Sequence, residues 1–272
     1  MKLKTMSGLA VLAITAALST TARAGDLRDL CPDRPGKGTS PCTVDPGHIQ
    51  LETEFFNAAF QRQAGVTTDT YVTANTTVKY GLTDNWDIEA AVAPYTVART
   101  HDENAATRRT VQGFGDLILR TKYNVLGNGA GAFGIALDPF IKIPTAKLGI
   151  GNHAVEGGLL VPMSLDLGGD WSLGATPEVD VLKNGGDSGR HVSLTGVVGL
   201  GRALGQGVTL GAELWTSQNR DPMGTVRQYS VDFDVAWQPQ DSGNVQYDAG
   251  INRGLNSATP RWQGYLGLTR RF

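Results

Sequence analysis

The sequence predicts an all-β protein: an antiparallel, up-and-down transmembrane β-barrel of about twelve strands, placed in the outer membrane of a Gram-negative bacterium. Three observations predict it. The chain opens with an export signal, it then repeats alternating apolar and polar runs of strand length, and the connections between runs alternate between short and long. Beyond the signal, no stretch reaches the roughly 18 apolar residues that a spanning helix needs.

Residues 1–24 are expected to be a signal peptide. Lys2 and Lys4 give a positively charged start, residues 6–18 are mostly apolar, and residues 22–24 form a small-x-small cleavage site. The apolar stretch is too short for a membrane anchor. The mature chain is therefore predicted to begin at Gly25.

Residues 25–46 are expected to form a short periplasmic segment ahead of the barrel. This segment holds both cysteines of the chain, Cys31 and Cys42, which flank a loop rich in proline and glycine. Export places them in an oxidising compartment, which favours a structural disulfide. The alternative is a metal or redox pair, but none of the four histidines lies at ligand spacing from the cysteines. No metal site is predicted.

Residues 47–272 are expected to form the barrel. Tyr229 to Gln238 shows the pattern best, because apolar and polar residues alternate strictly and aromatic residues stand at both ends of the apolar face. The alternation is weakest from Thr70 to Tyr80. The predicted strands are 47–60, 68–80, 86–99, 113–126, 131–143, 154–167, 171–182, 191–204, 207–217, 226–238, 244–253 and 260–272.

The connections between these runs fall into two classes that alternate along the chain. Short turns of glycine, asparagine and aspartate, such as 82–85 and 205–207, suit tight periplasmic hairpins. Longer polar connections, of which 100–112 is the longest, are expected to be outside loops. A soluble lipocalin-like barrel or sandwich would also alternate, but it rarely uses so many strands of this length.

The last strand ends in Phe272. A terminal phenylalanine on an alternating strand resembles the C-terminal signal of bacterial outer-membrane proteins, which the barrel assembly machinery recognises. In this register Arg270 faces lipid, which is tolerable near the interface, where the cost is about 0–1 kcal/mol and the side chain can extend to the head groups.

The run from Cys31 to Glu52, followed by glycine-rich hairpins and the terminal phenylalanine, resembles a family of outer-membrane transporters named for the MetA pathway of phenol degradation. The resemblance covers most of the mature chain, and its most specific part is the N-terminal block. It implies an outer-membrane channel or transporter, with small aromatic compounds as candidate solutes. It assigns no binding residues.

The inward face of the predicted barrel carries many charges, with about twice as many acids as bases. Rings of carboxylates favour cations in a pore, whereas ion pairs between the same groups would brace the wall. Phe56, Phe140 and Trp215 are expected to point inward and narrow the lumen. The pore-lining candidates are Glu52, Glu54, Asp87, Glu89, Asp116, Arg120, Lys122, Asp138, Lys142, Glu178, Asp180, Glu213, Asp232, Asp234 and Asp248.

The sequence therefore favours a porin-like channel or transporter for the passive passage of small solutes. The alternatives are a barrel enzyme acting on lipids and a structural or adhesive barrel. An enzyme would need a lipid-facing pair of serine and histidine. No such pair emerges, since Ser193 shares the inward face with His191, and no catalytic residue is assigned. Outer-membrane lipids and a small solute are the expected partners, no cofactor is predicted, and the net charge of −2 gives no support to nucleic-acid binding.

Overall fold

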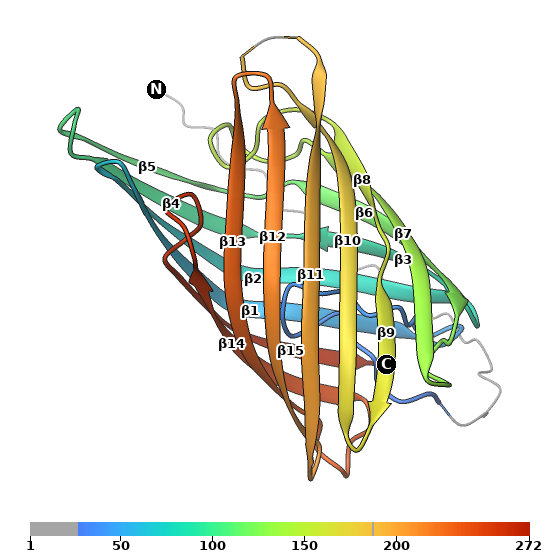
Figure 1. The fold of residues 1–272 in the computed structure, drawn as a ribbon. Coiled ribbons are helices and arrows are strands. Elements are labelled where there is room, and N and C mark those ends of the chain that lie inside the picture. The colour runs from blue at the N-terminus through green and yellow to red at the C-terminus, as the bar shows by residue number, and fades with distance from the viewer. Residues whose placement is uncertain (1–26, 187) are drawn as a thin grey trace, which may run out of the picture.

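A computed structural model describes residues 27–186 and 188–272, which form one closed antiparallel barrel (Figure 1). The predicted signal peptide and cleavage site lie outside the described residues. The strands are β1 (Ile49–Gln63), β2 (Val66–Thr83), β3 (Trp86–Val92), β4 (Tyr95–Asp102), β5 (Thr107–Gly113), β6 (Leu117–Leu126), β7 (Phe133–Ile143), β8 (Glu156–Leu160), β9 (Met163–Gly168), β10 (Trp171–Lys183), β11 (Arg190–Gly205), β12 (Val208–Asp221), β13 (Gly224–Trp237), β14 (Val245–Gly254) and β15 (Trp262–Arg271).

The barrel wall has twelve positions, here called staves, each filled by one continuous strand or by two shorter strands in line. The fifteen strands make twelve staves because three staves are interrupted. β3 and β4 pair one after the other with β2, and β8 and β9 pair one after the other with β10. β5 and β6 continue each other in the same way against β4 and β3. The break between β8 and β9 falls at Val161-Pro162, where proline has no N–H to donate to a ladder. Pairing of β1 with both β2 and β15 closes the barrel, which confirms the predicted architecture.

The outer surface of the barrel is apolar and the interior is charged, the reverse of a soluble protein. Phe233, Val235 and Trp237 on β13 are exposed on the outside. Trp237 stacks on Tyr247 of β14, with ring centroids 5.7 Å apart, at one end of the apolar band. The largest fully buried side chains include Lys79 and Lys122. The protein therefore belongs in the bacterial outer membrane, with its polar core in the lumen.

In the described ranges, no helix is long and apolar enough to cross a membrane.

The two ends of the barrel can be assigned from the longest connection and from the chain end, since two-residue turns stand at both ends. The turns 84–85 and 206–207 lie at one end, and the turns 64–65 and 222–223 lie at the other, together with the longest connection, residues 144–155. The carboxyl end of the chain lies with the turns 84–85 and 206–207, where the Phe272 amide donates to the Ile49 carbonyl at 2.8 Å. Because the longer connections of such barrels face outward, the end with Phe272 is the periplasmic one. The other end is extracellular.

The prediction that Phe56 points into the lumen is wrong. The register of β1 against β15 shifts between Glu54 and Phe56, so that Phe55 forms a bulge. Opposite it on β2, Ala74 has a φ of 55°. Beyond these two residues the alternation of both strands is inverted, and Phe56 faces lipid with 45% of its surface exposed. The bulge also explains why the alternation from Thr70 to Tyr80 is weak.

The prediction of a long outside loop at residues 100–112 is also wrong. β4 and β5 pair from Thr96↔Gly113 to Asp102↔Thr107, leaving only residues 103–106 as the turn. This hairpin continues the barrel wall outward (Figure 1). The polar side chains of residues 100–112 suggested a loop. Strand pairing is nevertheless favoured there, because it satisfies backbone N–H and C=O groups that an irregular loop would leave to water.

Candidate functional site

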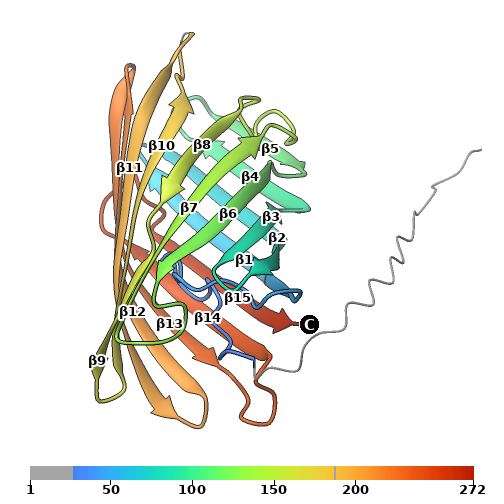
Figure 2. The same ribbon diagram turned by 90° about the vertical axis from the view of Figure 1, so that its right-hand side faces the viewer.

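Residues 27–46, here called the lumenal segment, fold back into the barrel interior from the periplasmic end (Figure 2). The Cys31–Cys42 disulfide closes its central loop, as the sequence predicted. Side chains from β1, β2, β6, β12, β13 and β14 bind this loop, so it is held from several sides of the wall. The segment therefore occupies a large part of the periplasmic half of the lumen.

Asp33 anchors the segment to one side of the wall. Its carboxylate accepts hydrogen bonds from Lys79 of β2 and from Lys122 of β6, the latter at 2.6 and 2.9 Å. Lys79 Nζ also lies 2.7 Å from Glu52, and Lys122 Nζ lies 3.5 Å from Glu89. Burial by itself raises the pKa of Asp33, but the ammonium groups of Lys122 and Lys79 outweigh it and hold this pKa well below its usual range.

Arg34 anchors the next residue of the segment to the neighbouring wall. Its guanidinium donates to Asp248 of β14 at 2.7 and 3.2 Å and lies 3.4 Å from Glu54 of β1. The same guanidinium lies over the Tyr265 ring, 5.5 Å from its centroid. A carboxylate held by two guanidinium nitrogens is among the stronger charged contacts in proteins.

Lys37 reaches a third side of the wall. Its ammonium lies 2.9 Å from Asp232 of β13, donates to Ser230 at 2.6 Å and stands 4.5 Å from the centroid of the Trp215 ring. The Lys37 amide donates to Glu213 at 2.7 Å. Trp215 therefore points inward as predicted, although its role here is to hold the segment.

Gly36 fits its place because it lacks a side chain. Its φ is +92°, and a Cβ there would lie 2.6 Å from Glu213 Oε1. The backbone conformation therefore favours glycine, and a larger residue would also have to displace the Glu213 carboxylate.

The carboxyl end of the segment is tied to the periplasmic rim. Asp45 accepts hydrogen bonds from Arg28 Nε at 2.8 Å and from Arg271 Nη1 at 2.7 Å. The Val44 amide donates to Asp87 at 2.9 Å, and the Pro41 carbonyl accepts from Asn124 at 2.8 Å. These contacts seal the segment against the rim at the start of the barrel.

A cavity of about 260 Å³ remains between the lumenal segment and the wall made by β10, β11 and β12. The wall is hollow here because the inward side chains are small. Gly174 and Thr176 of β10, with Gly199 of β11, line it together with Val197 and Glu213. The segment contributes Pro32, Pro35, Gly38 and Thr39 to the opposite side.

A second group of charges lies on the wall away from the segment. Arg120 of β6 stands 3.9 Å from Asp138 of β7, and its guanidinium lies 5.7 Å from the centroid of the Phe140 ring. Phe140 therefore points inward, as predicted. Lys142 pairs with Glu156 at 2.7 Å and with Asp116 at 3.3 Å. These ion pairs brace neighbouring staves of the barrel.

The predicted pore-lining residues divide into three sets. Seven contact the lumenal segment: Glu52, Glu54, Asp87, Lys122, Glu213, Asp232 and Asp248. Seven lie among other lumenal charges or on the inward face of β10: Glu89, Asp116, Arg120, Asp138, Lys142, Glu178 and Asp180. Asp234 lies against Gly211, where an added Cβ would meet its carboxylate.

Sequence reasoning missed that Asp33, Arg34 and Lys37 are the partners of these wall charges. A signal was present, because three charged residues stand within the short disulfide-closed loop. Gly174, Thr176 and Gly199 were also missed as lining residues, since small side chains carry no charge pattern.

The fold is that of known outer-membrane barrels. The family described as "Putative MetA-pathway of phenol degradation" matches residues 32–272. The KdgM porin aligns with a TM-score of 0.50 at 9% identity, covering 83% of this chain and 99% of that one. The beta domain of the Bordetella autotransporter BrkA aligns with a TM-score of 0.53 at 16% identity, covering 84% and 100%. Comparison with curated protein sequences found no match.

Proposed function

The chain belongs to the family of the MetA pathway of phenol degradation, and from that premise we propose that it is an outer-membrane channel for the passive passage of small solutes. The passage would run between the lumenal segment and the wall of β10, β11 and β12. The twelve-strand barrel supports this, since its lumen lies between the filled eight-stranded kind and the open porins.

The cavity beside the lumenal segment is the observation that carries the proposal. Its volume of about 260 Å³ exceeds the roughly 150 Å³ that holds one benzene molecule in a protein interior. Pro32, Pro35 and Val197 give it apolar faces, and Glu213 and Thr176 give it polar groups. Small aromatic compounds, which the family name suggests, are therefore the proposed solutes.

Filling the cavity is expected to lower the conductance. The nearest atom to a Cβ at Gly174 would be the Met163 carbonyl oxygen, 4.0 Å away, so Gly174→Leu would fill the passage without disturbing the wall. The expected result is a severalfold lower single-channel conductance in planar bilayers. The matched control is Gly196→Leu, which places the same side chain on the lipid-facing side of β11, where the nearest atom is Thr216 Cγ2 at 3.7 Å. Equal conductance in both variants would contradict the proposed passage.

We do not assign an enzymatic activity. His191, the histidine at the start of β11, is buried on the inward side. Its Nδ1 lies 3.0 Å from Asn184 Oδ1 and 3.6 Å from Asp221. These are amide and carboxylate groups, and neither is the hydroxyl nucleophile that a lipid hydrolase of the serine type needs. The proposed channel needs no catalytic group.

We further propose that the barrel assembly machinery recognises Phe272. Phe272→Ser is expected to reduce the amount of folded barrel in the outer membrane, measured by heat-modifiable migration of membrane extracts. The control is Phe133→Ser, because Phe133 is another exposed phenylalanine at the periplasmic end of a strand. An equal loss in both variants would mean that lost apolar surface, and not a terminal signal, is responsible.

A further inference from the structure

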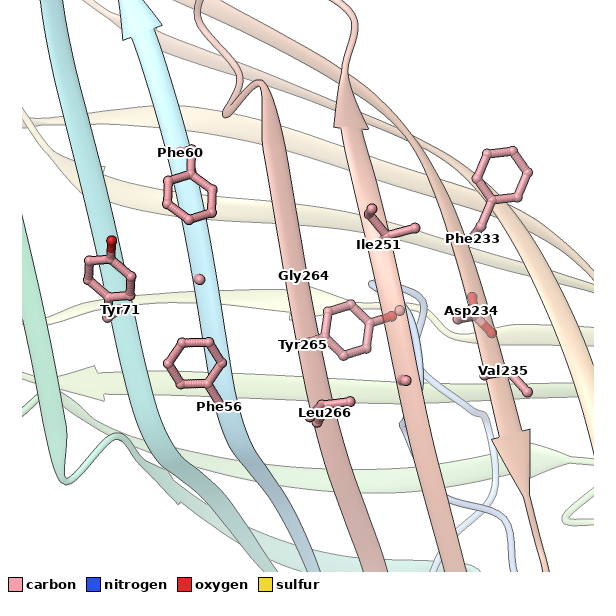
Figure 3. Close-up of a pocket in the computed structure, with 13 residues that line it drawn as sticks. Phe56, Phe60, Tyr71, Phe233, Asp234, Val235, Ile251, Gly264, Tyr265 and Leu266 are labelled. Carbon is pink, nitrogen blue, oxygen red and sulfur yellow. The ribbon is translucent and has the colours of Figure 1, made fainter.

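The lipid-facing surface has a hollow over β1, β14 and β15, with a volume of about 730 Å³ (Figure 3). Ala58, Ala249 and Gly264 are the small outward-facing residues of its lining. Its walls are larger apolar side chains on both sides: Phe56, Phe60, Tyr71, Phe233, Ile251 and Leu266. We call this hollow the outer groove.

The outer groove exists because small residues stand at outward positions on three neighbouring strands. Ala58 of β1 pairs with Gly264 of β15, and Ala249 of β14 pairs with Leu266, two residues further along β15. A Cβ at Gly264 would meet only the Gly250 carbonyl, at 3.8 Å, so close packing does not require glycine there. On most of the barrel such outward positions carry large apolar residues. The missing side chains leave room for a ligand in the lipid layer.

The outer groove lies toward the extracellular side of the membrane. β15 runs from Trp262 at its extracellular end to Arg271 at its periplasmic end, and Gly264 is near its start. β14 runs the other way, so Ile251 is near its extracellular end. The groove therefore faces the outer leaflet.

A cation stands at the extracellular end of the groove. Arg253 lies two residues beyond Ile251 on the same outward face and pairs across strands with Trp262. Its guanidinium lies 4.7 Å from the centroid of the Trp262 ring and donates to the Arg261 carbonyl at 2.9 Å. In residues 27–186 and 188–272, no carboxylate lies within 4.0 Å of it.

Near the interface a lipid-facing guanidinium is tolerated, and the anionic head groups there are its natural partners. The aromatic ring fixes its position, and its remaining N–H groups are free to bind a phosphate. An apolar groove ending at such a cation is complementary to a lipid with an acyl chain and a phosphate. In the outer leaflet that description fits the phosphorylated, acylated lipid A.

We propose that the outer groove is a specific binding site for one lipid A molecule. An acyl chain lies over Ala58 and Gly264, and a phosphate binds Arg253. The site is separate from the lumenal passage, so it holds whether or not the barrel conducts.

The test is native mass spectrometry of the mature protein extracted from outer membranes in mild detergent. The wild type is expected to retain one lipid A. Gly264→Phe, which fills the groove, and Arg253→Gln, which removes the cation, are each expected to lower this retained fraction by about tenfold.

Two control variants match these changes at places without a groove. Gly196→Phe adds the same ring to the outward face of β11, and Arg202→Gln removes a guanidinium that lies 4.8 Å from the centroid of the Trp171 ring near the periplasmic end. Both are expected to retain lipid A like the wild type. Equal retention in all five proteins would overturn the proposal. So would retention of phospholipid alone, or a dimer that only the groove variants dissociate.

Discussion

A mature barrel that lacks residues 25–46 is expected to conduct on the order of tenfold more current than the full mature chain. The lumenal segment is held by Asp33, Arg34 and Lys37 on three sides of the wall and leaves about 260 Å³ beside it. Removing it would open the full cross-section of the lumen. The measurement is the single-channel current of both proteins, refolded and recorded in planar bilayers under the same salt conditions.

The control for this deletion is the fold of the barrel itself. Every pairing between the named strands lies within residues 49–271, and beyond it the deletion removes the isolated bridge Pro46↔Gly81, so the shortened protein is expected to keep heat-modifiable migration on gels. Because a deletion removes many contacts, Lys37→Gln provides a milder variant, which frees the segment from Asp232 and Trp215. It is expected to show intermediate conductance and more frequent opening. A folded deletion variant with unchanged conductance would rule out the segment as the restriction.

Asp33→Asn is expected to lower the free energy of local opening of the lumenal segment by about 3 kcal/mol, because it removes one partner from a buried ion-pair cluster. Asparagine keeps the shape and can still accept from the Ser40 amide, which lies 3.1 Å from Asp33 Oδ1. The ammonium groups of Lys79 and Lys122 lose the carboxylate that joins them. Amide hydrogen exchange in the segment is expected to rise roughly 100-fold.

Asp29→Asn is the matched control, since Asp29 belongs to the same segment but is exposed. The effect of Asp33→Asn should also depend on pH in a defined direction. The pKa of Asp33 is lower in the folded protein than in the unfolded chain. Its contribution to the stability of the lumenal segment is therefore fully present above the unfolded pKa of about 4 and is lost as the pH falls through the folded pKa. The difference between wild type and Asp33→Asn should therefore persist from neutral pH to about pH 4 and shrink only below it. Equal exchange in Asp33→Asn and Asp29→Asn would contradict this anchoring role.

The barrel could be predicted from local patterns because successive residues of a strand point to opposite faces of the sheet, so that apolar and polar residues alternate along the sequence. Tyr229 to Trp237 alternates without interruption, and β13 spans that run in one register against both neighbours. The turn residues between strands gave the order and direction of the staves. Both signals act over a few residues and need no knowledge of distant parts of the chain.

The remaining features depend on contacts that alternation does not encode. A bulge at Phe55, matched by Ala74 on β2, inverts two strands at once, and only the cross-strand register reveals it. Arg34 and Asp248 are 214 residues apart, so their pairing follows from the closed barrel. About half of the charges predicted to line a pore instead contact the lumenal segment, and the proposed passage is lined largely by small residues that carry no charge.

The carboxylates near the cavity set the expected selectivity. Glu213 lines it, and Glu178 and Asp180 follow Thr176 on the inward face of β10. The wall bases Lys79, Lys122, Arg120 and Lys142 lie on staves other than those of the cavity wall. The ammonium of Lys37, in the lumenal segment, is paired with Asp232. A pore lined by carboxylates favours cations.

The central claim is that small solutes pass through the barrel beside the lumenal segment. Its most direct test is the single-channel current of the mature wild-type protein in a planar bilayer under a salt gradient. The account predicts small, discrete steps and a reversal potential on the cation-selective side. Small aromatic compounds added to one side should reduce those steps, because they enter the cavity beside the lumenal segment. A folded, heat-modifiable barrel that never conducts would contradict the claim, and the lumenal segment would then close the barrel completely.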